Sequence, residues 1–309
     1  MLIDAGMERR AVELDWSRTV DRRLVHRDAL AEVLLTDLVR RGESSFEVAA
    51  QWPRSHRVYR PDADGRHDPM LILETVRQTG LALSHFGFGV DRDQYSIMRD
   101  IGFTLTPDCE PRTELAATNI AISVECVDIR MLSGSLRTMT VILDFRHGEK
   151  RFATGTGTLT WMSPATFRAL RERHRTQLPD GPVTVAVPSP SRWRSAADSL
   201  IAAPDPAFPR RRLLVPLDHP VYFDHPLDHV PGLLLIDAAW QAASQTLPAG
   251  YRLLGCHMEC PSFTELAPDV LIDVRRSSPQ AIEFEISQAE QVTTRGELRI
   301  GPVGQPPAA

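Results

Sequence analysis

The sequence has no long hydrophobic run, only four cysteines and a single lysine, Lys150. None of its apolar stretches reaches the roughly 20 residues that span a membrane, and its first residues lack the apolar core of a secretion signal. We therefore expect a cytoplasmic protein without a membrane partner. The cysteines, at positions 109, 126, 256 and 260, form neither a dense disulfide framework nor paired zinc ligands. Buried structural thiols are the better interpretation, and no metal site is expected.

Positive charge is also limited, because the formal net charge is −5. A nucleic-acid partner usually requires a basic stripe or domain, so we expect none. Hydrophobic residues make up 42% and charged residues 24% of the chain, which is typical of a folded protein, and 309 residues suit two domains of ordinary size. The positive charge is almost entirely arginine, whose planar fork suits phosphate or carboxylate groups.

The first half predicts one strand, one long apolar helix and then a series of strands. The opening strand is 46–52, and the helix covers 69–85 with Asp68 as N-cap and Pro69 at its first position. Further strands are expected at 95–105, 115–130, 136–145 and 152–162. A helix followed by consecutive strands indicates an α+β fold with an antiparallel sheet. One apolar helix laid against such a sheet is the hotdog arrangement, although periodicity alone leaves other α+β folds open.

The same order recurs after a connector rich in proline and arginine. A strand at 213–217 precedes an apolar helix at 233–247, and more strands are expected at 251–258, 270–275, 281–287 and 291–300. The predicted division is an N-terminal extension (1–44), a first domain (45–163), a connector (164–210), a second domain (211–301) and a tail (302–309).

A local repeat supports this duplication. The segment HDPMLILETVRQTG (67–80) matches HVPGLLLIDAAWQAA (229–243) with one extra residue in the second. The match pairs His67 with His229, Pro69 with Pro231, Glu74 with Asp237, and Gln78 with Gln241. Duplication therefore explains the chain length and places each motif at a central helix.

Each predicted helix carries an acid with polar or bulky neighbours on one face. Glu74, Arg77 and Gln78 share a face of the first helix, and Asp237, Trp240 and Gln241 share one in the second. An ordinary solvated stripe would explain such a face. The rest of both helices is too apolar for surface placement, however, and burial tends to raise a carboxyl pKa toward the range of a general base. We therefore favour a catalytic interpretation.

The turns before the two helices carry further candidates. His225, His229 and Gly232 precede or begin the second helix, where free N–H groups can stabilise the oxyanion of an attacked thioester. The alternative is that both histidines only bond to the backbone of a tight turn. The first turn offers polar groups suited to an anionic ligand, namely Arg54, His56, Arg57 and His67.

The order DHPLDHVPG before an apolar helix with an acid is similar to the hydroxyacyl-carrier-protein dehydratases of the hotdog fold. A closer resemblance covers most of the chain. The segments VHRDALAEVLLTDL (25–38), AAQWPRSH (49–56), 67–80 and YFDHPLDHVPGLLLIDAAWQAA (222–243) together resemble the A-factor synthase family of γ-butyrolactone signalling enzymes. The resemblance implies a tandem double hotdog, with each half an antiparallel sheet wrapped around one central helix.

The resemblance also implies transfer of a β-ketoacyl group from acyl carrier protein to dihydroxyacetone phosphate. In the mechanism that the residues permit, Glu74 deprotonates or orients the attacking hydroxyl, and Arg54 or Arg77 binds the phosphate. No cofactor is implied. The second helix departs from the family pattern, because Asp237 is shorter than the usual glutamate and Trp240 replaces an arginine. Trp240 is expected to shape an acyl tunnel instead.

Two other functions stay open from the sequence. A dehydratase or thioesterase would use His225 with Asp237, and a non-catalytic acyl-binding protein would fit a decayed second half. Arg54, His56 and Arg77 favour a phosphorylated acceptor over simple hydrolysis. A fused pair of hotdog units forms a complete monomer, and a homodimer is the alternative.

Overall fold

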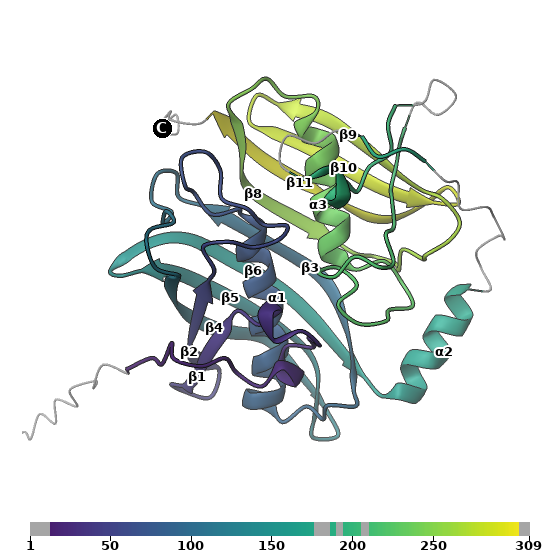
Figure 1. Cartoon of the computed structure of the whole chain (residues 1–309). Coiled ribbons are helices and arrows are strands. Elements are labelled where there is room, and N and C mark those ends of the chain that lie inside the picture. The colour runs from purple at the N-terminus through teal and green to yellow at the C-terminus, as the bar shows by residue number, and fades with distance from the viewer. Residues whose placement is uncertain (1–12, 176–185, 190–193, 205–209, 303–309) are drawn as a thin grey trace, which may run out of the picture.

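The computed structural model describes residues 13–175, 186–189, 194–204 and 210–302. One antiparallel sheet of eleven strands organises these residues, in the order β1-β2-β4-β5-β6-β3-β8-β11-β10-β9-β7 (Figure 1). The first repeat contributes β1 (Leu35–Arg40), β2 (Ser45–Trp52), β3 (Tyr95–Leu105), β4 (Thr118–Leu132), β5 (Ser135–His147) and β6 (Lys150–Met162). The second repeat contributes β7 (Arg211–Arg212), β8 (Tyr251–Glu259), β9 (Val270–Ser278), β10 (Ala281–Gln288) and β11 (Gln291–Pro302).

The two repeats join through one strand pair. β3 of the first repeat pairs with β8 of the second, from Asp100 opposite Glu259 to Thr104 opposite Gly255. This pairing makes a single continuous sheet, with one main hydrophobic core running through both repeats. The α+β double hotdog predicted from the sequence is therefore confirmed.

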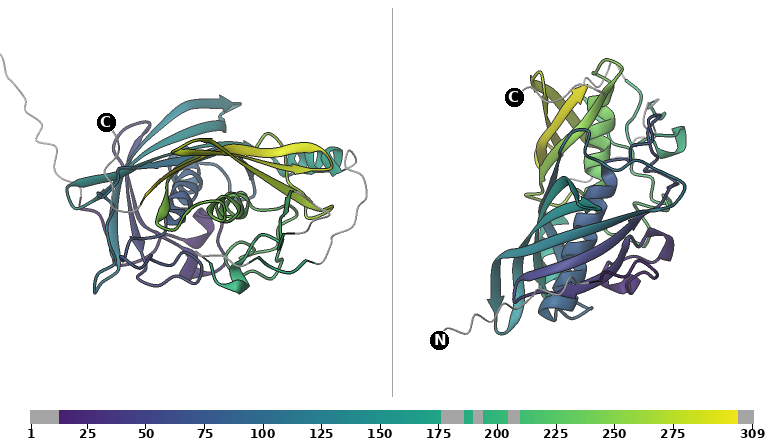
Figure 2. Two further views of the ribbon diagram at one scale, coloured as in Figure 1. Left: turned by 90° about the horizontal axis from the view of Figure 1, so that it is seen from above. Right: turned by 90° about the vertical axis from the view of Figure 1, so that its left-hand side faces the viewer.

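Two central helices, α1 (Met70–Phe88) and α3 (Gly232–Ser244), lie on the same face of the sheet (Figure 2). The backbone N–H of Met70 donates to the Asp68 carboxylate, and Gly89 ends α1 in the left-handed conformation at φ 67°. Gly155 of β6 allows α1 to approach closely, because a methyl group there would lie 2.5 Å from the Val76 side chain. Close packing leaves both helices almost wholly buried.

Several predicted boundaries differ from the structure. β1 joins the sheet although its residues fall in the expected N-terminal extension. The strand expected at 213–217 is wrong, because β7 ends at Arg212 and only Leu213 makes a further bridge, to Ile201. Pro216 lacks an N–H for a ladder, and a turn follows it. The first helix continues past Gly87, where the absence of a side chain accommodates the Phe46 ring.

The predicted connector contains ordered structure in its described parts. Helix α2 (Pro164–Arg175) packs beside the second repeat, and residues 199–203 return to pair with 187–189 and 212–214. The N–H of Leu200 donates to the side chain of Gln241 on α3. None of the helices in the described ranges is long and apolar enough to cross a membrane.

Candidate active site

Each central helix carries a buried acid and a buried glutamine, and an arginine from a preceding segment pairs with the acid. In the first repeat, Arg27 Nε donates to Glu74 Oε1 at 3.1 Å, and Gln78 donates to the same oxygen. In the second, Arg194 donates from Nε and Nη2 to the two Asp237 oxygens at 2.9 Å each. Gln78 and Gln241 then each accept from the N–H of a leucine, Leu34 or Leu200. The local sequence repeat therefore corresponds to a repeated polar core.

Each cluster also connects to the other repeat. Arg27 Nη1 donates to the carbonyl of Val221, 2.6 Å away, and Arg194 Nη1 donates to the carbonyl of Val58 at 3.4 Å. Val221 belongs to the turn before α3 and Val58 to the turn before α1. Each arginine therefore binds the turn of the other repeat. The contacts are related by an approximate two-fold exchange of the repeats.

His56 takes part in this framework and not in the cleft described below. Its Nδ1 accepts from the N–H groups of Val58 and Tyr59 at 3.2 and 3.0 Å, and its Nε2 lies 3.2 Å from Glu32. His219 holds the second turn in the same manner, with its Nδ1 accepting from Val221 and Tyr222. His56 is therefore a histidine that bonds to the backbone of a tight turn, which was the alternative role for His225 and His229.

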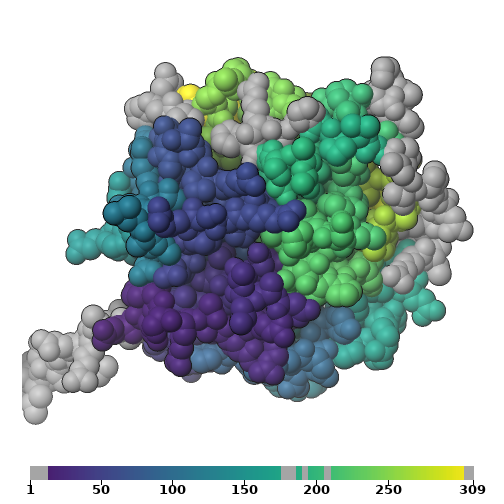
Figure 3. Space-filling model, in the orientation of Figure 1, coloured from purple at the N-terminus to yellow at the C-terminus, as the bar shows by residue number. Residues whose placement is uncertain are grey.

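Four expected site residues converge on one large cleft between the repeats. Arg77 reaches it from α1, while His225, His229 and Gly232 reach it from the turn and first residue of α3. We call it the arginine-lined cleft, because its lining includes Arg23, Arg27, Arg77, Arg92, Arg168 and Arg171 against four carboxylates. Figure 3 shows the purple N-terminal segment beside the green segment leading into α3. The Asp224 carboxylate ties these segments, accepting from the N–H groups of Asp28 and Ala29.

Glu74 lies beneath this cleft and differs from its expected role. Burial alone would raise its pKa, but Arg27 and Arg77 outweigh burial and lower the pKa of Glu74 to about 2. Arg77 Nη2 lies 2.7 Å from Oε1 and its Nε lies 2.9 Å from Oε2. The expectation of a raised pKa is therefore wrong. A carboxylate that accepts from three side chains orients Arg77 toward the cleft and is a poor proton acceptor.

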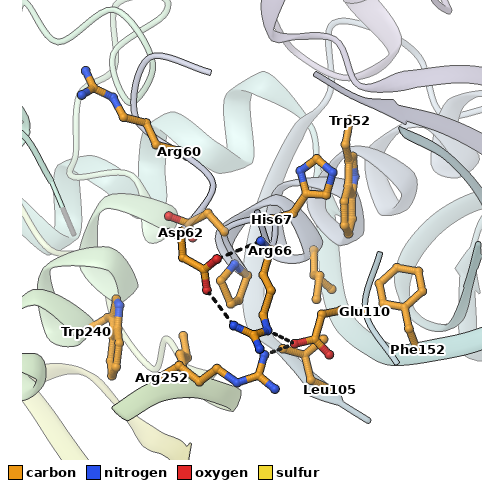
Figure 4. A pocket seen from close by; sticks show the side chains of 14 residues that line it. Trp52, Arg60, Asp62, Arg66, His67, Leu105, Glu110, Phe152, Trp240 and Arg252 are labelled. Atoms are coloured by element: carbon orange, nitrogen blue, oxygen red, sulfur yellow. Dashed lines mark hydrogen bonds and ion pairs between the residues drawn. The ribbon is translucent and has the colours of Figure 1, made fainter. Parts of the chain in front are cut away.

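The corresponding place in the second repeat is nearly closed. Trp240 occupies the position equivalent to Arg77 and lines a cavity of about 40 Å³ together with His67, on the turn before α1 (Figure 4). Arg66 extends into this space and pairs with Asp62 at 3.4 Å and with Glu110 at 3.5 Å. A cavity of this size holds only a few waters and is too small for an acyl chain, so the structure shows no acyl tunnel beside Trp240.

The remaining expected residues lie apart from the cleft. Asp237 and Gln241 are fully buried, and the Tyr222 hydroxyl donates a short hydrogen bond to Asp237. His67 Nε2 lies 2.8 Å from Thr118 Oγ1, and burial lowers the pKa of His67 to about 4. Arg54 is exposed after β2 and does not line the cleft. The expected pairing of His225 with Asp237 is not seen, because His225 lines the cleft while Asp237 is enclosed.

Sequence reasoning missed the arginines that hold the acids and one histidine pair. Each of these arginines precedes an acid-x-Leu pattern: Arg27 precedes Glu32 to Leu34, and Arg194 precedes Asp198 to Leu200. The repetition of this pattern was the available signal in the sequence. His26 lines the cleft, and its Nε2 lies 2.9 Å from that of His85. In the described part of the chain, no three His, Cys, Asp or Glu side chains gather as a metal site.

Comparisons with known proteins agree with this architecture. The family profile of the A-factor biosynthesis hotdog domain matches residues 11–163 and 195–303. A 2-oxo-3-(phosphooxy)propyl 3-oxoalkanoate synthase of Streptomyces virginiae is 37% identical over 233 residues, covering 75% of this chain and 78% of the relative. A synthase of the same name from Streptomyces coelicolor is 29% identical over 243 residues, covering 79% and 77%.

Solved structures resemble the chain in fold. The 12:0-ACP thioesterase from Umbellularia californica has a TM-score of 0.53 at 11% identity, covering 85% of this chain and 99% of that protein. An acyl-ACP thioesterase from Bacteroides thetaiotaomicron has a TM-score of 0.52 at 13% identity, covering 84% and 100%. At these identities the likeness concerns the hotdog fold alone.

Proposed function

Because the chain belongs to the A-factor biosynthesis hotdog family, we propose that it transfers a β-ketoacyl group from acyl carrier protein to the hydroxyl of dihydroxyacetone phosphate. The observation that carries this proposal is the arginine-lined cleft, in which Arg77 is held by a buried, ionised Glu74. Binding of a phosphorylated acceptor requires fixed positive charge, whereas hydrolysis, in which water is the acceptor, does not require it.

The phosphate binds at Arg77. Its side chain is 19% exposed, so the guanidinium remains open to the cleft while Glu74 fixes its orientation. Arg27 lies beneath, also paired with Glu74, and contributes positive charge without reaching solvent freely. In this arrangement Glu74 and Gln78 act through Arg77 and Arg27. Asp237 and Gln241 serve the equivalent structural purpose for the second repeat.

The thioester binds at the start of α3. Helix N–H groups at Gly232 and Leu233 have no intrahelical acceptor, and both residues line the cleft, so they suit the oxyanion that forms on the attacked carbonyl. A neighbouring cavity of about 200 Å³ shares Met98, His229 and Gly232 with the cleft and is lined further by Ile97 and Leu235. This cavity receives the acyl chain, and the carrier protein docks at the arginine-rich rim.

The test is direct transfer. Purified protein is incubated with a β-ketoacyl carrier protein and dihydroxyacetone phosphate, and the phosphorylated ester is followed by mass spectrometry beside Arg77→Met. We expect ester with the wild type and at least a tenfold lower rate with the variant at low acceptor concentration. Arg54→Met is the matched control, because Arg54 is exposed outside the cleft lining. Free acid as the main product would favour a thioesterase, and an enoyl chain a dehydratase.

A further inference from the structure

The cleft needs a group that takes the proton from the attacking hydroxyl, and Glu74 is unsuited to this step. Three histidines line the cleft, namely His26, His225 and His229. They differ in the hydrogen-bond partners of their ring nitrogens. These partners decide which histidine is suited to accept the proton.

His229 is the histidine that a carboxylate orients. Its Nδ1 lies 2.8 Å from Asp228 Oδ1, while the other carboxylate oxygen of Asp228 accepts from Arg171 Nε at 3.0 Å. The hydrogen bond from His229 is the main cause that holds the pKa of Asp228 well below its usual range. Since an ionised carboxylate can only accept, His229 Nδ1 carries the proton, and neutral His229 keeps its lone pair on Nε2.

Arg171, which lies outside the strands of the second repeat, holds the Asp228–His229 pair in place. It belongs to α2, which lies beside the turn leading into α3 (Figure 1), and only 3% of the residue is exposed. Its Nη2 donates to the carbonyl of Asp228 at 2.8 Å and to Glu265 at 2.7 Å. The helix predicted as part of a connector therefore anchors the turn that carries His229.

The other two histidines lack this arrangement. His225 lies 3.6 Å from Asp224, whose carboxylate already accepts from two backbone N–H groups. His26 pairs with another histidine, His85, which donates its own Nδ1–H to the carbonyl of Val90. Burial, with nearby His85, Arg77 and His225, lowers the pKa of His26 to about 3, so it is a weak proton acceptor.

We propose that His229 is the general base and acid of the transfer, with Asp228 and Arg171 as positioning residues. The inference rests on the proposed function. His229 lies beside Gly232, where the thioester carbonyl is placed. The acceptor hydroxyl oxygen bonds to the carbonyl carbon as its proton passes to His229 Nε2. The oxyanion then collapses, the carbon–sulfur bond breaks, and His229 returns the proton to sulfur, releasing the ester and the carrier thiol.

The first test needs no substrate. Nitrogen-15 NMR of the wild type is expected to show His229 as the Nδ1–H tautomer, and Asp228→Asn is expected to shift the population toward Nε2–H, because an amide can donate as well as accept. A wild-type His229 protonated on Nε2 alone would overturn the inference. This measurement stays informative if Arg171→Met destabilises the fold.

The second test is kinetic. His229→Ala is expected to lower kcat by about 10² to 10⁴-fold, with the KM for the carrier substrate changed less than threefold and added imidazole restoring part of the rate. Asp228→Asn and Arg171→Met should lower kcat more than they raise KM. His225→Ala is the matched comparison from the same turn. Undiminished kcat in His229→Ala, or rescue by imidazole in His225→Ala and not in His229→Ala, overturns the assignment. Absence of ester with the wild type instead refutes the proposed function itself.

Discussion

Replacing Glu74 by glutamine tests whether this residue holds the site or performs the chemistry. The change is nearly isosteric but removes the charge between Arg27 and Arg77, both paired with Glu74 within 3.0 Å. The pKa of Glu74 falls from 4.5 to about 2 in the folded protein, and at about 1.4 kcal/mol per pKa unit this corresponds to roughly 3 kcal/mol of stability. Removing one partner of a buried ion pair costs about 3 to 5 kcal/mol, which is of similar size.

The assay is urea unfolding followed by circular dichroism at pH 7, beside Glu125→Gln on the exposed side of β4, where less than about 0.5 kcal/mol is expected. Because the folded pKa is depressed, the Glu74 contribution is complete above the ordinary pKa near 4.5 and is lost as the pH falls toward 2. The wild type and Glu74→Gln should therefore converge in stability at acid pH. A Glu74→Gln variant as stable as the wild type at pH 7 would refute the argument that these buried ion pairs stabilise the fold.

Three further results are expected. Arg77→Lys should raise the KM for dihydroxyacetone phosphate about tenfold with a smaller change in kcat, measured from initial rates, since a lysine does not reproduce a planar two-point contact. Gly232→Ala should destabilise the protein by less than about 1 kcal/mol in thermal unfolding, because its methyl group would lie 2.2 Å from Met98 Cε, the end of a flexible side chain that can move aside; a larger loss would contradict this. Calorimetric titration with glycerol 3-phosphate should give one site per chain, because Trp240 and its neighbours fill the second position; two equivalent sites would contradict this.

Periodicity was sufficient to predict the framework. The alternation of β3 and β6 and the apolar length of α1 are local properties, so their residue ranges were close to those of the structure. β1 was missed because Leu35–Arg40 is short and mixed in polarity, and it becomes a strand by pairing with β2. Its partner β2 begins only five residues later, so the hairpin is local in sequence and was concealed by the mixed polarity of β1.

The site was harder to predict, because it depends on contacts between residues far apart in the chain. Helical spacing placed Glu74 and Arg77 on one face, but the pKa of Glu74 depends on Arg27, which is 47 residues away along the chain. The role of His229 depends on Arg171, 57 residues from the Asp228 that it orients. Residue type and spacing identified which side chains could react. Only the folded contacts determine which of them are ionised, enclosed or open to the cleft.

The two repeats show how one framework produces one open site and one closed site. Each has a buried acid, an arginine from a preceding segment and a glutamine that bonds to the backbone, so both repeats are built around the same polar cluster. The difference lies three residues after the acid, where Arg77 extends toward the cleft and Trp240 lines a small cavity. Both turns carry the equivalent histidine, but His67 on the turn facing Trp240 is buried against Thr118, whereas His229 on the turn facing Arg77 lines the cleft beside Asp228. Because the buried cluster is present with either residue at this position, the fold does not require an arginine there.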